Sequence, residues 1–220
     1  MVILHNATNL VFLLSVSDDL DMQMRFLNTV PLYMCRDYYR NIVRFVKLGC
    51  INSIRYYLFV QATKTLVLAF VFSWLDYCNS LFSGCPQYLL KRLQKVQNNA
   101  ACLILKAPKT DHITPHLHTL HWLPINATIK SKLCSLCFGA ITSTGPVYLS
   151  DLLKIYTPSR QLLSSDVRML CIPSVNTKSY GERSFSNTAS TLWNTLPKDI
   201  KFSYSVSSFR SVCKTHLFPK

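Results

Sequence analysis

The chain has 220 residues, of which 49% are hydrophobic and 12% aromatic, so it carries enough apolar material to bury a core. This composition excludes a disordered tail. Basic residues outnumber acidic ones by 24 to 10, and three of the acids (Asp18, Asp19 and Asp21) lie together near the N-terminus. From residue 22 onward the balance is 24 − 7 = +17. Such a charge favours a polyanionic partner, because bound phosphates release their counterions. Nucleic acid is the first candidate and anionic lipid the second.

Several classes of enzyme are excluded by composition. The chain has a single glutamate, Glu182, so paired-glutamate catalysis is impossible and carboxylate chemistry would rest on scattered aspartates. Five glycines provide no phosphate-cradling loop of the Walker or dinucleotide type. Cysteine, histidine and serine are numerous, but no nucleophile elbow singles out a catalytic pair. We therefore expect no small-molecule substrate.

The nine cysteines lie mostly inside apolar stretches, which suits reduced, buried thiols in an intracellular compartment, nucleus or cytoplasm. Secretion is the alternative, because the first 17 residues are uncharged and Asn-Ala-Thr sequons occur at Asn6 and Asn126. No basic segment precedes the short apolar run, so we expect no export. The longest apolar stretch, Thr65 to Leu75, has 11 residues. A membrane span needs roughly 18 or more, and none is predicted.

The N-terminal elements are a strand and a basic helix. Residues 9–16 are predicted to form a short buried strand. Residues 35–48 show a helical pattern that ends at Gly49, a natural C-cap. Four cations of this helix fall within about 80° of arc, opposite its apolar side. They are Arg36, Arg40, Arg44 and Lys47.

Two further helices are predicted over residues 61–82 and 86–107. The first is apolar on nearly all sides, as expected of a helix buried among others. The second is bounded by Pro86 and Pro108 and has an apolar seam from Leu89 to Ala107. Its opposite face carries a row of cations and amides able to run beside a phosphate backbone. This row consists of Lys91, Arg92, Lys95, Asn98, Asn99 and Lys106.

The rest of the chain is predicted to be helical with one loop-rich segment. A loop over 108–115 precedes a helix capped by Asn126, which ends before Gly145-Pro146. Residues 156–183 are rich in Ser, Thr and Pro and are predicted to form loops with one hairpin. Two amphipathic helices close the chain, Phe185 to Leu196 and Ser207 to Leu217. The last one is expected to point Phe209, Val212, Cys213 and Leu217 inward.

Two groups of residues invite a metal-site interpretation. Four histidines (His112, His116, His118 and His121) occur within ten residues, but their spacing matches no familiar tetrahedral set. Cys134 and Cys137 form a Cys-x-x-Cys pair on a helix next to leucines, with no second such pair in the chain. Buried thiols are the better interpretation of this pair. We expect neither a metal ion nor another cofactor.

Taken in order, a series of strings resembles the region that follows the polymerase palm in jockey-like LINE (non-LTR) retrotransposon reverse transcriptases. The order of the series is more specific than any single match. The strings are Leu75–Ser80, Leu93–Asn98, Asp111–Pro115, Leu120–Pro124, Tyr156–Arg160, Ser164–Asp166, Tyr180–Phe185, Leu192–Pro197 and Val206–Arg210.

The resemblance implies a mainly α fold with a short N-terminal β element. Residues 1–30 would be the edge of the palm, 31–108 a thumb-like helical domain and 109–155 a helical extension. A loop-rich connector (156–184) and C-terminal helices (185–220) would follow. Thumbs of this family grip template and primer through phosphates. The resemblance therefore implies non-specific binding of RNA, DNA or their hybrid by the two basic helix faces.

The same resemblance implies that this chain lacks the catalytic centre. Reverse transcription needs carboxylates that hold two Mg²⁺ ions, and in the family these lie upstream of the matched region. Asp18-Asp19 follows Val16-Ser17 rather than an aromatic residue, and no aspartate precedes it. We therefore expect a catalytically incomplete fragment. Two alternatives stay open, namely an incomplete gene model of an active RNA-directed DNA polymerase, and a structural or interaction protein or unselected product without biochemical activity.

Overall fold

A computed structural model describes residues 48–77, 79–157, 168–177 and 181–218 of the chain. These residues are mainly helical, as predicted, and they contain no sheet, only an isolated antiparallel bridge between Ile155 and Leu170. The predicted strand over 9–16 lies outside the described residues. So does the basic face formed by Arg36, Arg40, Arg44 and Lys47.

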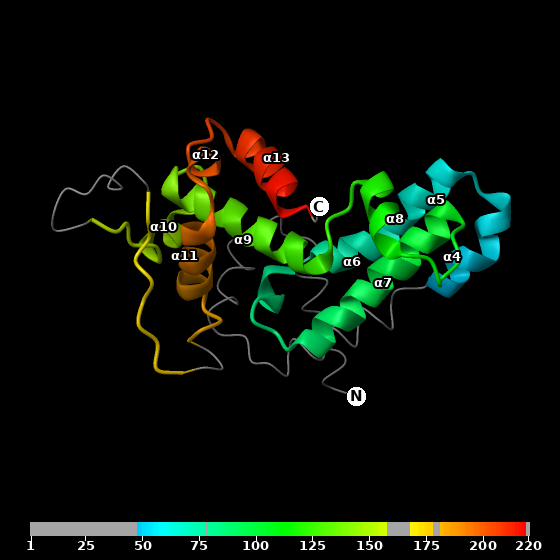
Figure 1. Ribbon diagram of the computed structural model, residues 1–220, viewed down its shortest axis with the longest axis horizontal. Coiled ribbons are helices and arrows are strands. Elements are labelled where there is room, and N and C mark those ends of the chain that lie inside the picture. Colours follow the sequence, from blue (N-terminus) through cyan, green and yellow to red (C-terminus); the bar gives the residue numbers. More distant parts are fainter. Residues whose placement is uncertain (1–47, 78, 158–167, 178–180, 219–220) are drawn as a thin grey trace.

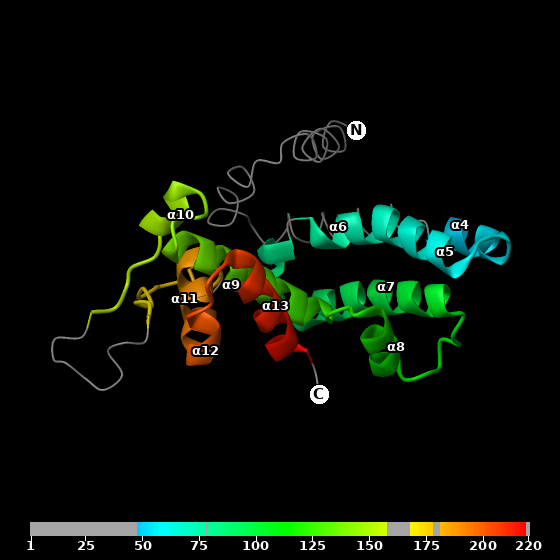
Figure 2. The ribbon, with the colours of Figure 1, turned by 90° about the horizontal axis from the view of Figure 1, so that it is seen from above.

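The described helices form two lobes along the long axis (Figures 1 and 2). We call α4 to α8 the first lobe and α9 to α13 the second lobe. The first lobe comprises α4 (Leu48–Ile54), the 3₁₀ turn η1 (Arg55–Tyr57), α5 (Val60–Val67), the π-helical η2 (Leu68–Phe72), α6 (Ser73–Asp76), the 3₁₀ turn η3 (Asn79–Phe82), α7 (Gln87–Leu105) and α8 (Ile113–Leu120). The second lobe comprises α9 (Ile125–Ile141), α10 (Val147–Asp151), α11 (Phe185–Thr195), α12 (Lys198–Lys201) and α13 (Val206–Leu217).

Helix α7 is the centre of the first lobe, with the α5–α6 segment on one side and α8 on the other (Figure 2). The predicted start of this helix is confirmed, because it begins directly after Pro86; it ends at Leu105, two residues before the predicted end. Lys106 follows in the left-handed conformation (φ 55°), and Pro108 cannot continue the helix. Leu89, Leu93 and Ala100 of the predicted seam are buried. The helix is therefore anchored along its apolar back.

The segment before α7 differs from its prediction. A helix over 61–82 is observed as a nearly continuous helical run from Val60 to Asp76, after which Tyr77 is extended. The prediction that it is buried all round is wrong. Val67, Val71 and Leu75 are buried on one face, whereas Phe70 on another is 57% exposed. Apolar composition alone did not reveal that this helix packs on one side only.

Gly49 does not end a helix, contrary to the predicted C-cap, because it lies inside α4. A Cβ added at Gly49 would meet no atom within 4 Å, so neither crowding nor a left-handed backbone requires glycine there. The predicted loop over 108–115 is also too long, since α8 begins at Ile113. Asn126 is not a cap either. Pro124 occupies the N-cap of α9, and Asn126 is exposed in its first turn.

Prolines begin four of the described helices. Pro86, Pro124, Pro146 and Pro197 stand at the N-caps of α7, α9, α10 and α12. A fixed φ near −60° leads the chain into a helix, and the missing N–H costs nothing where helical amides have no partner. Only Pro86 was used to predict a helix start, and the short α12 was not predicted.

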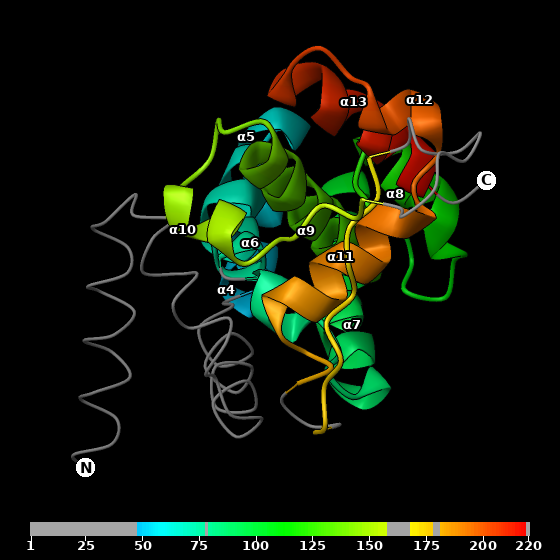
Figure 3. The same cartoon turned by 90° about the vertical axis from the view of Figure 1, so that its left-hand side faces the viewer.

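An aromatic cluster forms the core of the second lobe. α11 and α13 both pack on α9 (Figure 3). The rings of Phe138 on α9 and Phe209 on α13 stack with 4.4 Å between their centroids, and Trp193 on α11 lies 6.0 Å from Phe209. The limits of α11 and α13 match the predicted ones to within a residue. Val212 was expected inside, but it is 42% exposed.

Long-range hydrogen bonds fix the loop-rich connector to both lobes. Trp193 Nε1 donates to the Arg168 carbonyl (2.6 Å), and Asn194 exchanges two hydrogen bonds with the backbone of Leu170 (2.9 and 3.0 Å). Arg183 donates to the carbonyls of Leu81 and Ser83 at the end of η3 (3.1 Å each). Within the described ranges, no helix combines the length and the apolar character needed to cross a membrane.

Candidate nucleic-acid interface

One face of α7 carries four of the eight cations predicted to bind nucleic acid. Lys91, Arg92, Lys95 and Lys106 are all exposed, and the helix contains no acidic residue. From Lys91 to its end at Leu105 the helix rises about 21 Å, at 1.5 Å per residue, and Lys106 follows as the C-cap. One strand of a duplex presents roughly six phosphates over that axial length. The structure thus brings these four cations to one surface, while the other four lie outside the described residues.

Two glutamines of α7, Gln94 and Gln97, bond within the protein and are not free to contact a ligand. Gln94 Nε2 donates to Asn98 Oδ1 (2.8 Å), and Gln94 Oε1 accepts from the backbone N–H of Ile125 (2.9 Å). Gln97 is buried and donates to the Leu123 carbonyl (2.8 Å). These bonds join α7 to the start of α9 and satisfy one of its first amides. Of the two amides predicted to face a phosphate backbone, Asn98 is thus bonded to this junction through Gln94.

Arg55 holds the C-terminal end of α7 in place. The residue is only 5% exposed, and its guanidinium donates to the carbonyls of Leu103 (2.9 Å), Ile104 (3.0 Å) and Leu58 (2.9 Å). The last carbonyls of a helix lack intrahelical partners, and the negative end of the helix dipole favours a cation. Sequence reasoning missed this residue, because its partners lie 48 and 49 positions away.

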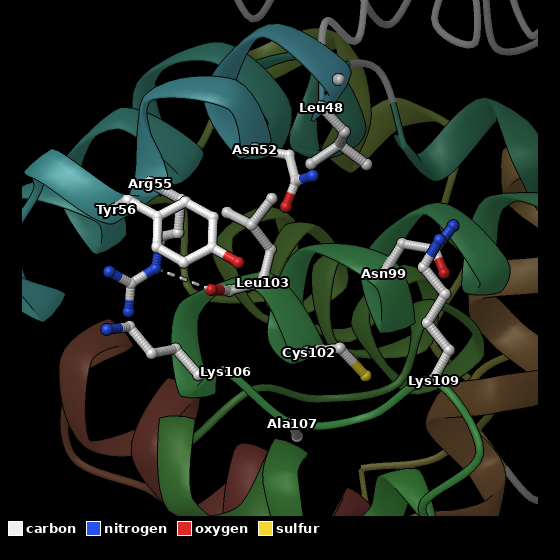
Figure 4. Close-up of a pocket in the computed structure, with 11 residues that line it drawn as sticks. Leu48, Asn52, Arg55, Tyr56, Asn99, Cys102, Leu103, Lys106, Ala107 and Lys109 are labelled. Carbon is white, nitrogen blue, oxygen red and sulfur yellow. Dashed lines mark hydrogen bonds between the residues drawn. The ribbon is translucent and has the colours of Figure 1, made fainter.

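A cavity of about 430 Å³ opens where the basic face ends (Figure 4). Helix α4 and η1 form one wall, and the last turns of α7 with the loop after it form the other. Tyr56 and Lys106 lie at one side of the opening, and Asn99 and Lys109 at the other (Figure 4). Its lining comprises Leu48, Gly49, Asn52, Arg55, Tyr56, Asn99, Cys102, Leu103, Lys106, Ala107 and Lys109.

The histidines and thiols that invited a metal interpretation do not form a ligand set among the described residues. In the part of the chain that the structure describes, no three His, Cys, Asp or Glu side chains are grouped to hold a metal ion. The Cys134 thiol donates a hydrogen bond to Cys213, and this bond together with burial raises the pKa of Cys134 far above its usual range; burial raises the pKa of Cys137 as well. Both thiols therefore stay protonated near neutral pH, a state that suits neither metal binding nor nucleophilic attack.

Comparison of the chain with family models, with curated proteins and with solved structures gives no match. The functional argument therefore rests on the arrangement of side chains.

Proposed function

We propose that this protein binds nucleic acid non-specifically, through the phosphate backbone of RNA, DNA or a hybrid duplex. The observation that carries the proposal is the alignment of Lys91, Arg92 and Lys95 on an exposed face of α7 without an intervening acid. Among the described carboxylates, none lies within ion-pair distance of Lys91 or Lys95. Their charge is therefore available to an external anion.

A basic helix face is also the ordinary solvent side of an amphipathic helix, because long cationic side chains commonly cover such surfaces. Two features favour a binding role for α7. Its position is fixed by Gln97, which bonds to the Leu123 carbonyl before α9, and by Arg55 at the C-terminal end of the helix, so the helix presents its cations from a fixed position. The whole chain also has an excess of 14 positive charges. Such a field attracts polyanions and speeds their encounter.

We further propose that the chain corresponds to the thumb and C-terminal region of a jockey-like LINE reverse transcriptase and has no polymerase activity of its own. Several of the strings that resemble this family contact one another. Gln97 of Leu93–Asn98 bonds to Leu123 of Leu120–Pro124, and the ring of Trp193 of Leu192–Pro197 lies 6.0 Å from that of Phe209 of Val206–Arg210. Matching strings that contact one another in the structure support a fold shared with this family better than isolated matches in the sequence would.

The proposed chemistry is recognition of phosphates without sequence readout. Cations on a straight helix reach the backbone of a duplex, and such contacts position a protein without specifying bases. Binding should therefore vary little with sequence and weaken steeply as salt rises.

The direct test replaces three cations of α7 by glutamine in the full-length chain (Lys91→Gln, Arg92→Gln and Lys95→Gln). Glutamine is as good a helix former as lysine, so α7 should be retained. A matched control makes the same charge change in the second lobe, at the exposed Lys198, Arg210 and Lys214. Anisotropy of a labelled duplex should show a loss of affinity of roughly tenfold or more for the α7 variant and a much smaller loss for the control. Equal losses would refute the role of α7.

A role as an interaction protein is the second candidate, favoured by exposed apolar side chains around η1. Ile54, Tyr56, Tyr57, Phe59 and Val60 are each 46% exposed or more. Exposed apolar side chains gathered in one short segment are a feature of surfaces that bind other proteins. Gel filtration of the chain with and without nucleic acid separates the two candidates. Self-association that persists with bound nucleic acid, together with weak, salt-independent binding, would favour the second.

A further inference from the structure

The cavity between α4 and α7 lies at the end of the basic face and has the size of a small-ligand site. Its volume of about 430 Å³ falls within the range of roughly 300–1,000 Å³ typical of ligand pockets. Asn99 and Lys106 belong both to the α7 face and to the cavity lining. A strand bound along α7 would therefore lead into this opening.

The lining is cationic. Arg55, Lys106 and Lys109 contribute three positive charges, and no lining residue is acidic. Arg55 is braced by three carbonyls rather than by a carboxylate, so its charge is not cancelled by a counter-ion. Asp111, in the loop after Lys109, lies 3.7 Å from His116 Nε2. The charge of the cavity complements a phosphate group.

Aromatic rings stand beside these cations. Tyr56 lines the cavity although it is 89% exposed; Tyr57 on the same turn is 88% exposed, and Phe59, at the N-cap of α5, is 87% exposed. Exposed rings next to cations are the usual means of holding unpaired bases, because any base can stack on them. A base inside a duplex has no free face, so this end of the lobe suits a nucleotide that is not paired.

We propose that the cavity holds an unpaired nucleotide at the end of a strand whose phosphates follow α7. Its base stacks on Tyr56, and its phosphate lies between Lys106 and Lys109. The side-chain amides of Asn52 and Asn99 form hydrogen bonds with the base or the sugar. This inference rests on the proposed function of α7 and adds a preference for junctions between duplex and single strand.

The test compares three labelled probes with the full-length chain: a blunt duplex, the same duplex with a single-stranded extension, and one whose extension is abasic. We expect the extended duplex to bind about tenfold more tightly than the blunt one, as stacking of a base or two would give. The abasic extension adds the same phosphates without bases. It should therefore recover little of the gain.

Two variants test the cavity itself. Tyr56→Ala should remove the gain from the extension and leave blunt-duplex affinity unchanged, whereas Tyr56→Phe keeps the ring and should keep the gain. Gly49→Leu places a side chain in the opening, where an added Cβ meets no atom within 4 Å, and it should act like Tyr56→Ala. Tyr204→Ala is the matched control, because Tyr204 is fully exposed in the second lobe.

The outcomes separate this inference from the proposed function. Equal affinity for blunt and extended probes, a full gain from the abasic extension, or a gain that survives both Tyr56→Ala and Gly49→Leu would each overturn the cavity as a nucleotide site. The aromatic turn would then be assigned to a protein partner. The triple variant of α7 should weaken both probes by the same factor. If that variant binds as well as the natural chain, the proposed function fails instead.

Discussion

Lys95 in the first lobe and Lys201 in the second lobe are both lysines, but the first is exposed to solvent and the second is buried. Lys95 is exposed in a row of cations on α7. Lys201, at the end of α12, is 1% exposed, and its amine lies 3.4 Å from the Asn194 carbonyl and 3.6 Å from the Met169 sulfur. Burial lowers the pKa of Lys201, and the Cys137 thiol offsets this in part. The comparison shows that the charge of Lys95 is open to solvent, whereas the charge of Lys201 is buried with only weak acceptors and costs stability.

The aromatic core of the second lobe gives the largest expected effect. Trp193→Ala removes a buried ring that packs near Phe138 and Phe209 and a hydrogen bond to the Arg168 carbonyl. We expect the free energy of unfolding to fall by about 3–5 kcal/mol. Chemical denaturation measures it, with the exposed Val212→Ala as the control. A loss of under about 1 kcal/mol would contradict the packing of the second lobe.

Arg55 shows that a buried cation can also stabilise, provided that it has acceptors. Arg55→Lys keeps the charge but cannot bond three carbonyls in a fixed fork, and it should reduce the free energy of unfolding by about 1–3 kcal/mol. Arg55→Met should cost at least as much, because α7 then also loses the cation at its C-terminal end. Thermal denaturation of both variants checks this. An unchanged melting temperature for Arg55→Lys would mean that charge alone is sufficient.

Lys201 should behave in the opposite way. Lys201→Met removes a buried charge that has only weak acceptors, and it should raise the free energy of unfolding by about 1–3 kcal/mol at neutral pH. The folded-state pKa of Lys201 lies below its usual value of 10.5. Between those two values the unfolded state binds more protons, so the stability of the natural chain rises with pH there.

Denaturation of the natural chain and of Lys201→Met over a range of pH tests this sign. The advantage of the variant should be largest at neutral pH and below, and it should shrink as the pH rises toward 10.5. Ionisation of the thiols in the unfolded state affects both chains alike and cancels in the difference. An advantage that grows with pH would contradict the account of Lys201.

Lys106 gives the smallest expected effect on stability. It adopts φ 55°, which a side chain disfavours and glycine adopts freely. Lys106→Gly should therefore increase the free energy of unfolding by about 0.5–1 kcal/mol. It should also remove one cation from the basic face. Stability and nucleic-acid affinity should thus change in opposite directions, whereas Lys106→Ala should lower both.

Local sequence patterns predicted the helices but not the packing and the long-range hydrogen bonds between them. The limits of α7, α11 and α13 follow from periodicity and from residues such as Pro86, which act over a few positions. Burial around the α5–α6 segment depends on which neighbours pack on it, and Phe70 shows that apolar character alone does not decide this. The roles of Arg55, Arg183 and Lys201 depend on partners distant in the chain or on burial. A single sequence contains no local signal for either.

The candidate site was predictable to the same degree. Helical spacing placed Lys91, Arg92 and Lys95 on one face, and the structure does the same. The binding role of these cations stays a prediction, as does that of Arg36, Arg40, Arg44 and Lys47. The cavity was not predicted, because its two walls come from residues 48–56 and 99–109, which are brought together only by packing.

The salt dependence of binding tests the central claim most directly. For the natural chain, the α7 triple variant and the matched triple variant of the second lobe, the logarithm of duplex affinity is measured against the logarithm of salt concentration. If Lys91, Arg92 and Lys95 each neutralise a phosphate, the slope should become shallower by about 0.9 per residue, or roughly three in total, for the α7 variant. The second-lobe variant should keep nearly the natural slope. Identical slopes for all three chains would contradict the claim that α7 binds nucleic acid.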